Sequence, residues 1–294
     1  MSLFDELVRH ALQNQKELLQ LRPVVEKELL HHDVIREMHQ AGLLTQLVFI
    51  GGTCLRACYG AERLSEDLDF TGGKNFNKQR LSALTHLLKK RLHDKYGLQV
   101  EISEPSKESG KETGNVSTWK IKITTQSARK NLPKQRINID ICAIPSYDAR
   151  PVLLRNHYGV DMGTSHLILQ AQSREEILAD KWVALALRPN RIKNRDLWDI
   201  VWLKQQAVQL PVPLIAKKIK DHHWSRTEFL KQLQTRLNQL REDPQLRTDF
   251  TEEMRRFLPV KTLKHFIETE HFWSYLVNLL EDEAKIVIHA IKTS

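Results

Sequence analysis

The chain has 294 residues, of which 41% are hydrophobic and 28% charged, a composition typical of folded globular domains rather than disordered chains. Its 45 lysines and arginines exceed its 36 acidic residues, and the resulting net charge of +9 favours a polyanionic partner. No apolar run is long enough to span a bilayer and the first twenty residues lack a signal peptide's apolar core, so we expect a cytoplasmic protein that does not bind membranes.

The first half of the sequence alternates between helical and strand-like patterns. Pro23 is typical of the start of a helix and Gly42 of its end. The pattern predicts, in chain order, two helices within 3–41, a strand at 46–50, a helix of about two turns at 53–60, a strand at 66–70, a basic amphipathic helix at 78–96, and strands at 98–103, 117–125 and 135–144. Residues 46–144 therefore predict a small α/β unit with a mixed sheet.

From residue 173 onward the pattern is helical throughout. Capping boxes are predicted at Ser173–Glu176 and Ser225–Glu228, where each serine and glutamate would satisfy the other's free amide. We place the domain boundary within 145–172 and assign two domains, residues 1–165 and residues 166–294. Most tryptophans are expected in the core of the helical domain, namely Trp182, Trp198, Trp202, Trp224 and Trp273.

The other residue types with metal-binding or redox chemistry give weaker signals. Three cysteines cannot all pair, and Cys54, Cys58 and Cys142 lack zinc-ligand spacing, so we expect free thiols and a reducing compartment. The histidine pairs at 31–32 and 222–223 look like solvated helix positions, so no site is assigned to them.

Two aspartates one residue apart give the first sign of chemistry. On a strand, Asp67 and Asp69 would point to one face while Leu68 and Phe70 face the core. Neighbouring carboxylates repel each other unless a cation lies between them, and oxygen ligands on a rigid strand suit Mg²⁺. Such a pair by itself is more often a solvated strand surface.

A third carboxylate strengthens the metal-site interpretation. In the strand at 135–144, three isoleucines share one face and Asp140 lies on the other. If this strand neighbours the first, three carboxylates converge, which is enough for a two-metal site. The segment Gly51-Gly52-Thr53 joins a strand to a helix, where backbone amides can hold a triphosphate. An ordinary strand-to-helix turn is the alternative for this segment.

The stretch "GGTCLRACYGAERLSEDLDF" at 51–70 resembles the signature of the AbiEii/AbiGii-type toxins, nucleotidyltransferases of the DNA polymerase β superfamily similar to the tRNA-modifying MenT toxins. Tyr59, Arg63 and Ser65 also resemble that branch. Three later segments resemble the family's remaining motifs: "RINIDI" with Asp140, "EEILADKW" with Lys181, and "RDLWDI" with Asp196 and Asp199. Arg136 stands where the family often has lysine.

The resemblance implies an α+β fold: a polymerase-β-like core with a small mixed sheet, preceded by helices and followed by an all-helical C-terminal domain. It implies a Mg²⁺-dependent toxin of a type IV-like toxin–antitoxin system that moves a nucleoside monophosphate from an NTP to an acceptor hydroxyl, releasing pyrophosphate. The expected acceptor is the 3′ end of tRNA, the expected outcome growth inhibition or phage defence, and the expected partner a cognate antitoxin.

The resemblance also assigns roles to residues. Asp67, Asp69 and Asp140 would bind two Mg²⁺ ions, and Lys181 would neutralise charge on the triphosphate. One of Asp196 and Asp199 would help to set the site, and the other could pair with Arg195. The expected catalytic residues are Asp67, Asp69, Asp140, Lys181 and Asp199, and the expected substrate-binding residues are Gly51, Gly52, Thr53, Arg63, Ser65 and Asp196.

The sequence leaves the acceptor open. The acid-free segments 129–136 and 188–195 are compatible with RNA phosphates but do not identify tRNA, and solvated loops are an equally good interpretation of each. A nucleotidyltransferase acting on a small molecule or a protein remains an alternative. So does a non-catalytic NTP-binding module.

Overall fold

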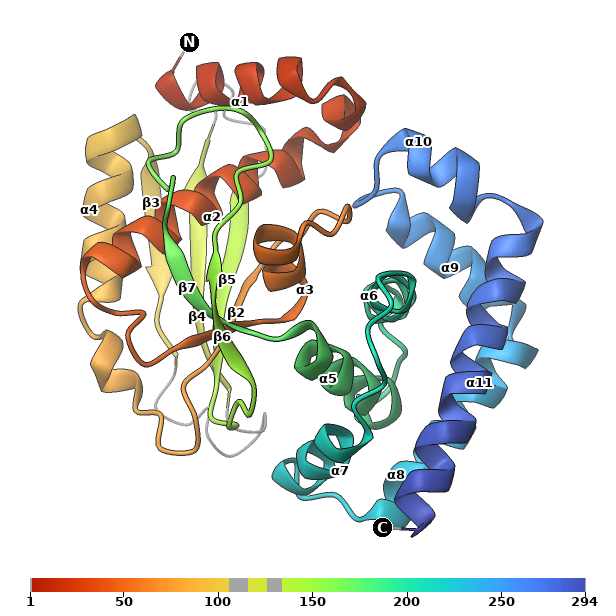
Figure 1. Ribbon diagram of the computed structural model, residues 1–294. Helices are drawn as coiled ribbons and strands as arrows, with labels where there is room; N and C mark the ends of the chain where they lie inside the picture. Colours follow the sequence, from red (N-terminus) through yellow and green to blue (C-terminus); the bar gives the residue numbers. More distant parts are fainter. Residues whose placement is uncertain (1, 106–115, 126–133, 294) are drawn as a thin grey trace. The chain divides into compact units, whose positions relative to one another are not determined.

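The computed structural model describes residues 2–105, 116–125 and 134–293 (Figure 1). The chain divides into two compact units, residues 1–171 and 172–294. The first unit extends beyond the predicted boundary at 165, because a strand at 168–172 joins its sheet next to Phe49.

The first unit contains the predicted helices and strands in the predicted order. Strands β6 and β7 lie in a segment where the sequence predicted none. The elements are α1 (Leu3–Asn14), the 3-10 helix η1 (Lys16–Leu21), α2 (Arg22–Gln40), β1 (Val48–Ile50), α3 (Gly51–Cys54), the π-helical turn η2 (Leu55–Tyr59), β2 (Leu68–Thr71), the 3-10 helix η3 (Lys78–Leu81), α4 (Leu84–Tyr96), β3 (Gln99–Ser103), β4 (Val116–Thr124), β5 (Gln135–Cys142), β6 (Ala149–Leu153) and β7 (Ile168–Gln172).

Among the described residues the strands form one seven-stranded mixed sheet in the order β3-β4-β5-β2-β1-β7-β6. Strand β2 runs parallel to β5 and antiparallel to β1, so it stands between the strand that precedes the glycine turn and the strand that carries Asp140. The mixed sheet expected from the sequence is thereby confirmed, and β2 lies at its centre.

One face of this sheet packs against helices. In Figure 1, α2 crosses the strands and α4 lies beside it. Gln135 of β5 and Thr125 after β4 both donate hydrogen bonds to Glu26 of α2, which shows which face the helix covers. Ile137 and Ile139 lie on that face and are fully buried. The core of the unit therefore lies between the sheet and its helical layer.

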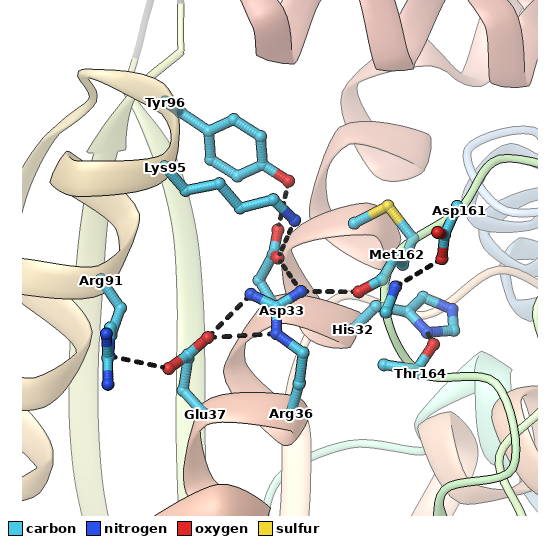
Figure 2. A network of polar contacts seen from close by, with 11 residues as sticks. His32, Asp33, Arg36, Glu37, Arg91, Lys95, Tyr96, Asp161, Met162 and Thr164 are labelled. Carbon is cyan, nitrogen blue, oxygen red and sulfur yellow. Dashed lines mark hydrogen bonds and ion pairs between the residues drawn. The ribbon is translucent and has the colours of Figure 1, made fainter.

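A buried carboxylate joins the two helices of that layer (Figure 2). Asp33 of α2 is fully buried and accepts hydrogen bonds from Lys95 Nζ at 2.7 Å and from the Tyr96 hydroxyl at 2.7 Å, both at the end of α4. Arg36, one turn further along α2, adds an ion pair at 2.8 Å. A buried carboxylate with this many donors is compensated for its lost hydration, so the contact holds α4 against α2.

The second unit is helical over its described residues, as predicted. Its helices are α5 (Arg174–Leu187), α6 (Asn194–Gln205), α7 (Val212–Asp221), α8 (Arg226–Glu242), α9 (Pro244–Met254), α10 (Val260–Thr262), the π-helical turn η4 (Leu263–Ile267) and α11 (Glu270–Thr293). None of the helices described in either unit is long and apolar enough to cross a membrane.

Several details of the helical unit refine the sequence predictions. The capping box at Ser225 is confirmed, with both reciprocal hydrogen bonds present. Ser173 caps α5 as predicted, while the Glu176 carboxylate forms an ion pair with Lys218 at 2.7 Å. Trp182 is fully buried, but the core assignment of Trp224 is wrong, because its side chain is 40% exposed just before α8.

Candidate active site

Two of the three predicted carboxylates lie side by side on neighbouring strands. In the parallel pair β2–β5, Asp69 is the register partner of Asp140. Leu68 and Phe70 are buried on the helix-covered face, so both half-buried aspartates belong to the opposite face. The register thus joins residues that are 71 positions apart in the sequence.

Asp67 precedes β2, and part of its carboxylate contacts the backbone. Its Oδ1 accepts a hydrogen bond from the Asn138 backbone N–H at 2.9 Å. Within the described part of the chain, no three His, Cys, Asp or Glu side chains are close enough to form a metal cage. The pair Asp69–Asp140 still suits Mg²⁺, because this ion keeps several water and phosphate ligands and seldom needs an all-protein cage.

Glycine is required at position 51 for two reasons. Its φ of +76° lies in the left-handed region, and a Cβ there would come within 2.9 Å of Asp69 Oδ2. Ile50, the residue before it, is paired with Asp69 across β1 and β2. The first amides of the helix that follows therefore lie next to the Asp69 carboxylate, and no side chain of the described residues caps that helix at Ile50.

The Thr53 and Ser65 hydroxyls hold the segment that leads into β2. They form a hydrogen bond of 2.6 Å with each other, and Thr53 Oγ1 also donates to the Asp67 backbone carbonyl. Both residues are buried, as is Arg63, whose guanidinium donates to the Leu64 carbonyl at 2.9 Å. These contacts hold the segment before β2 in place and so set the positions of Asp67 and Asp69.

Helix α2 supports the same segment with charged side chains that the sequence did not point to. Glu28 Oε1 accepts the Ser65 backbone N–H at 2.8 Å, and its Oε2 accepts from Arg56 at 3.1 Å and from the Tyr158 hydroxyl. Burial alone raises the pKa of Glu28, but Arg56 and the hydrogen bonds outweigh it and lower the pKa overall. Glu28 therefore stays ionised inside the unit.

The prediction that His31 and His32 are solvated is wrong. Both are buried in α2: a ring nitrogen of His31 lies 3.0 Å from the Glu66 carbonyl, and one of His32 lies 2.9 Å from the Thr164 hydroxyl. Burial lowers the pKa of His32 to about 4, so its ring is neutral at physiological pH. Next to Glu28 these rings line a small cavity of about 20 Å³, which has room for one water molecule.

Lys181 in the second unit lies between two carboxylates. Its Nζ is 2.5 Å from Asp196 Oδ1 and 2.8 Å from Asp199 Oδ2, and Arg188 contacts the other oxygen of Asp196 at 3.2 Å. Burial opposes ionisation of Asp196, but Lys181 together with Lys193 and Arg188 outweighs it, so the pKa of that carboxyl is lowered. Both aspartates thus hold the lysine, and Arg195 forms an ion pair with Glu253 at 3.2 Å. The contribution of this cluster to the carboxylate site stays a prediction.

The two basic segments expected to contact RNA differ in what the structure describes. Residues 129–133 of the first lie outside the described residues. In the second, Arg188 and Arg195 are engaged in ion pairs with acidic residues of the same unit. Cys54 and Cys58 are buried free thiols, as predicted.

Comparison with known families decides the assignment. The family model described as the nucleotidyl transferase AbiEii toxin of type IV toxin–antitoxin systems matches residues 33–278. The chain belongs to this family. It is therefore a nucleotidyltransferase toxin, and both a nucleotide substrate and an antitoxin partner accompany membership of the family.

One solved structure agrees with this fold, and a second shows a weaker similarity. The chain is similar to MenT4, a nucleotidyltransferase toxin from Mycobacterium tuberculosis, with a TM-score of 0.54 and 13% identity over 97% of this chain and 98% of that one. It is also similar to JHP933 from Helicobacter pylori, with a TM-score of 0.46 and 17% identity over 91% of this chain and 94% of that one. A comparison with curated proteins finds no match.

Proposed function

We propose that this AbiEii-family enzyme transfers a nucleoside monophosphate from an NTP to a hydroxyl of RNA, at the 3′ end of tRNA, in a Mg²⁺-dependent reaction. The observation that carries the proposal is the register of Asp69 with Asp140 beside Gly51. Growth inhibition or phage defence would follow from the loss of functional tRNA, and a cognate antitoxin would control it.

The carboxylates are suited to hold Mg²⁺ on the sheet face opposite α2. Asp69 and Asp140 would hold it, with Asp67 contributing the oxygen that does not accept the Asn138 amide. When bound, two such ions would neutralise the triphosphate and lower the pKa of the attacking hydroxyl.

The glycine turn is suited to hold the triphosphate. The amides of Gly51 and Gly52 lie at the uncapped start of α3, where backbone donors and the helix dipole attract phosphate. Thr53 would contribute its amide, since its hydroxyl already bonds Ser65 and the Asp67 carbonyl. Ser65 and Arg63 would act mainly by fixing this segment, a narrower role than the substrate binding expected for them from the sequence.

In the reaction, the acceptor oxygen forms a bond to the α-phosphorus while the bond between that phosphorus and the bridging oxygen of the β-phosphate breaks. Pyrophosphate leaves, and Asp140 accepts the hydroxyl proton. Lys181 would neutralise charge on the leaving group, held in position by Asp196 and Asp199.

The test is incubation of the purified full chain with each α-labelled NTP, Mg²⁺ and total RNA. We expect label in tRNA, no label with Asp69→Asn, and full labelling with Asp94→Asn, a control at an exposed position of α4. Label on a small molecule or on protein instead would show that RNA is not the acceptor. Growth arrest on expression of Asp69→Asn would favour a non-catalytic NTP-binding module.

A further inference from the structure

Cationic side chains share the sheet face that carries Asp69 and Asp140. In the antiparallel pair β4–β5, Thr118 is the partner of Asp140, Lys120 of Asn138, and Lys122 of Arg136. Side chains two residues apart on a strand point to the same face. Lys120, Lys122 and Arg136 therefore lie on the face of Asp140, and these three residues are called the cationic strip below.

The strip is open to solvent. All three side chains are exposed, and none of them forms an ion pair with another described residue. The α2 layer covers the other face, since Gln135 and Thr125 reach Glu26 from there. One carboxylate lies beside the strip: Glu101 of β3 is the register partner of Lys122, and it forms an ion pair with Lys134 at 2.5 Å.

The strip is continuous with the proposed catalytic carboxylates. Asp140, Asn138 and Arg136 follow one another along β5, and the rise of a strand places Arg136 about 13 Å from Asp140. A phosphate chain that approaches Asp69 and Asp140 meets two negative charges, and cations alongside offset that repulsion. The arrangement fits a long polyanion with one end at the carboxylates.

The chemistry of this face fits nucleic acid better than a protein partner. Protein interfaces rely on buried aromatic and large apolar side chains. Among the described residues, none of the exposed large apolar side chains lies on β3, β4 or β5. The neighbours of the strip are Thr118, Asn138 and Ser103, small polar side chains of the kind that contact phosphate and sugar, and Glu101, the register partner of Lys122.

We propose that the cationic strip binds the phosphate backbone of the acceptor RNA and leads its end to Asp69 and Asp140. This rests on the proposed function for the identity of the acceptor. It assigns the RNA contact to Lys120 and Lys122, which lie outside the family's motifs, and to Arg136, the first residue of the motif that carries Asp140.

The test compares two double variants with the same change in charge. Lys120→Glu with Lys122→Glu alters the strip, and Lys16→Glu with Lys90→Glu alters exposed residues of η1 and α4. Binding of a labelled tRNA transcript to the full chain, without NTP, is followed by fluorescence anisotropy over a series of salt concentrations. Thermal melting and Mg²⁺–NTP binding are measured for each variant.

We expect the strip variant to bind tRNA more weakly and to lower the slope of log affinity against log salt by about two, roughly one per lysine. The control should follow the wild type, and Lys120→Arg with Lys122→Arg should retain binding. If the glutamate variant melts early, Lys120→Gln with Lys122→Gln supplies the comparison.

Equal tRNA affinity in the strip and control variants would overturn the docking surface. The proposal would also be overturned if the wild-type chain bound an acidic protein partner through the strip but did not bind tRNA. Transfer to tRNA with an unchanged KM in the strip variant would refute the surface and leave the proposed function intact. Strip-dependent binding without any nucleotide transfer would support the surface and refute the function.

Discussion

The two faces of the sheet in the first unit differ although they are built from the same strands. On β5, Ile137 and Ile139 are fully buried under α2, while Arg136 and Asp140 alternate with them on the opposite face. The face under α2 holds the unit together, and the opposite face carries the carboxylates and the cationic strip. Successive residues of a strand point to opposite faces, so neighbouring residues of β5 contribute to folding stability on one face and to the proposed chemistry on the other.

From this comparison we predict that substitutions on the face of Asp69 and Asp140 change activity. Substitutions on the face under α2 should change stability. Glu28 is the informative exception, because it lies on α2 in the covering layer yet contacts Ser65 before the catalytic strand. Substitution there should change both properties.

The largest effect is expected on the face opposite α2, which carries the carboxylates. Asp69→Asn should lower nucleotide transfer roughly a thousandfold or more, because metal ions contribute several kcal/mol of transition-state stabilisation. The melting temperature should stay the same or rise, since one of two neighbouring carboxylates is neutralised. Single-turnover transfer and calorimetry measure the two quantities, and early melting with normal turnover would contradict the division of roles.

Glu28→Ala should change both properties at once. It leaves Arg56 buried without its carboxylate and should cost about 3–5 kcal/mol of unfolding free energy. Transfer by the folded fraction should also fall, because the Ser65 amide loses its acceptor. The matched control is Glu26→Ala on the same helix, whose partners include Gln135 and Arg22. Urea unfolding and kcat should separate the variants, with kcat retained only in the control.

Because of His32, the protein should become less stable as the pH is lowered. Its pKa drops from 6.5 in the unfolded chain to about 4 in the folded protein because of burial, so the unfolded state binds more protons between these values. The free energy of unfolding should therefore decrease by up to about 3 kcal/mol as pH falls from 6.5 to 4. His32→Gln should flatten that dependence in urea titrations, whereas His86→Gln on the exposed side of α4 should not.

The smallest effect is expected on the covered face. Ile139→Val should lower the unfolding free energy by about 1 kcal/mol by removing one buried methylene, with transfer by the folded protein unchanged. A loss of transfer larger than the loss of folded protein would show that the faces are not independent.

The sequence predicted most of the fold, because its signals were local. Alternation around Asp69 and Asp140 and the Pro23 and Gly42 boundaries depend only on neighbouring residues. The register that joins Asp69 to Asp140 depends on a pairing across 71 positions. The sequence could therefore say only that the carboxylates would meet if the two strands were neighbours. Strands β6 and β7 gave no clear pattern, since β6 contains Pro151 and is largely exposed.

The misassigned histidines show the same limit. A histidine pair in a polar helix resembles a solvated surface, and the partners that bury His31 and His32 lie 35 and 132 residues away.

Lys181 gave a clear signal as a lysine on an apolar helix face. Its carboxylate partners come from the next helix, so the sequence could not choose between them and a phosphate.

The central claim is that Asp69 and Asp140 together hold a divalent cation. Electron paramagnetic resonance can follow Mn²⁺ binding to the full chain in the presence of a non-hydrolysable NTP, for the wild type, Asp140→Asn and the control Asp94→Asn. We predict that the wild type and the control bind Mn²⁺ and that Asp140→Asn does not, although it melts normally. Wild-type Mn²⁺ affinity in Asp140→Asn would contradict the claim.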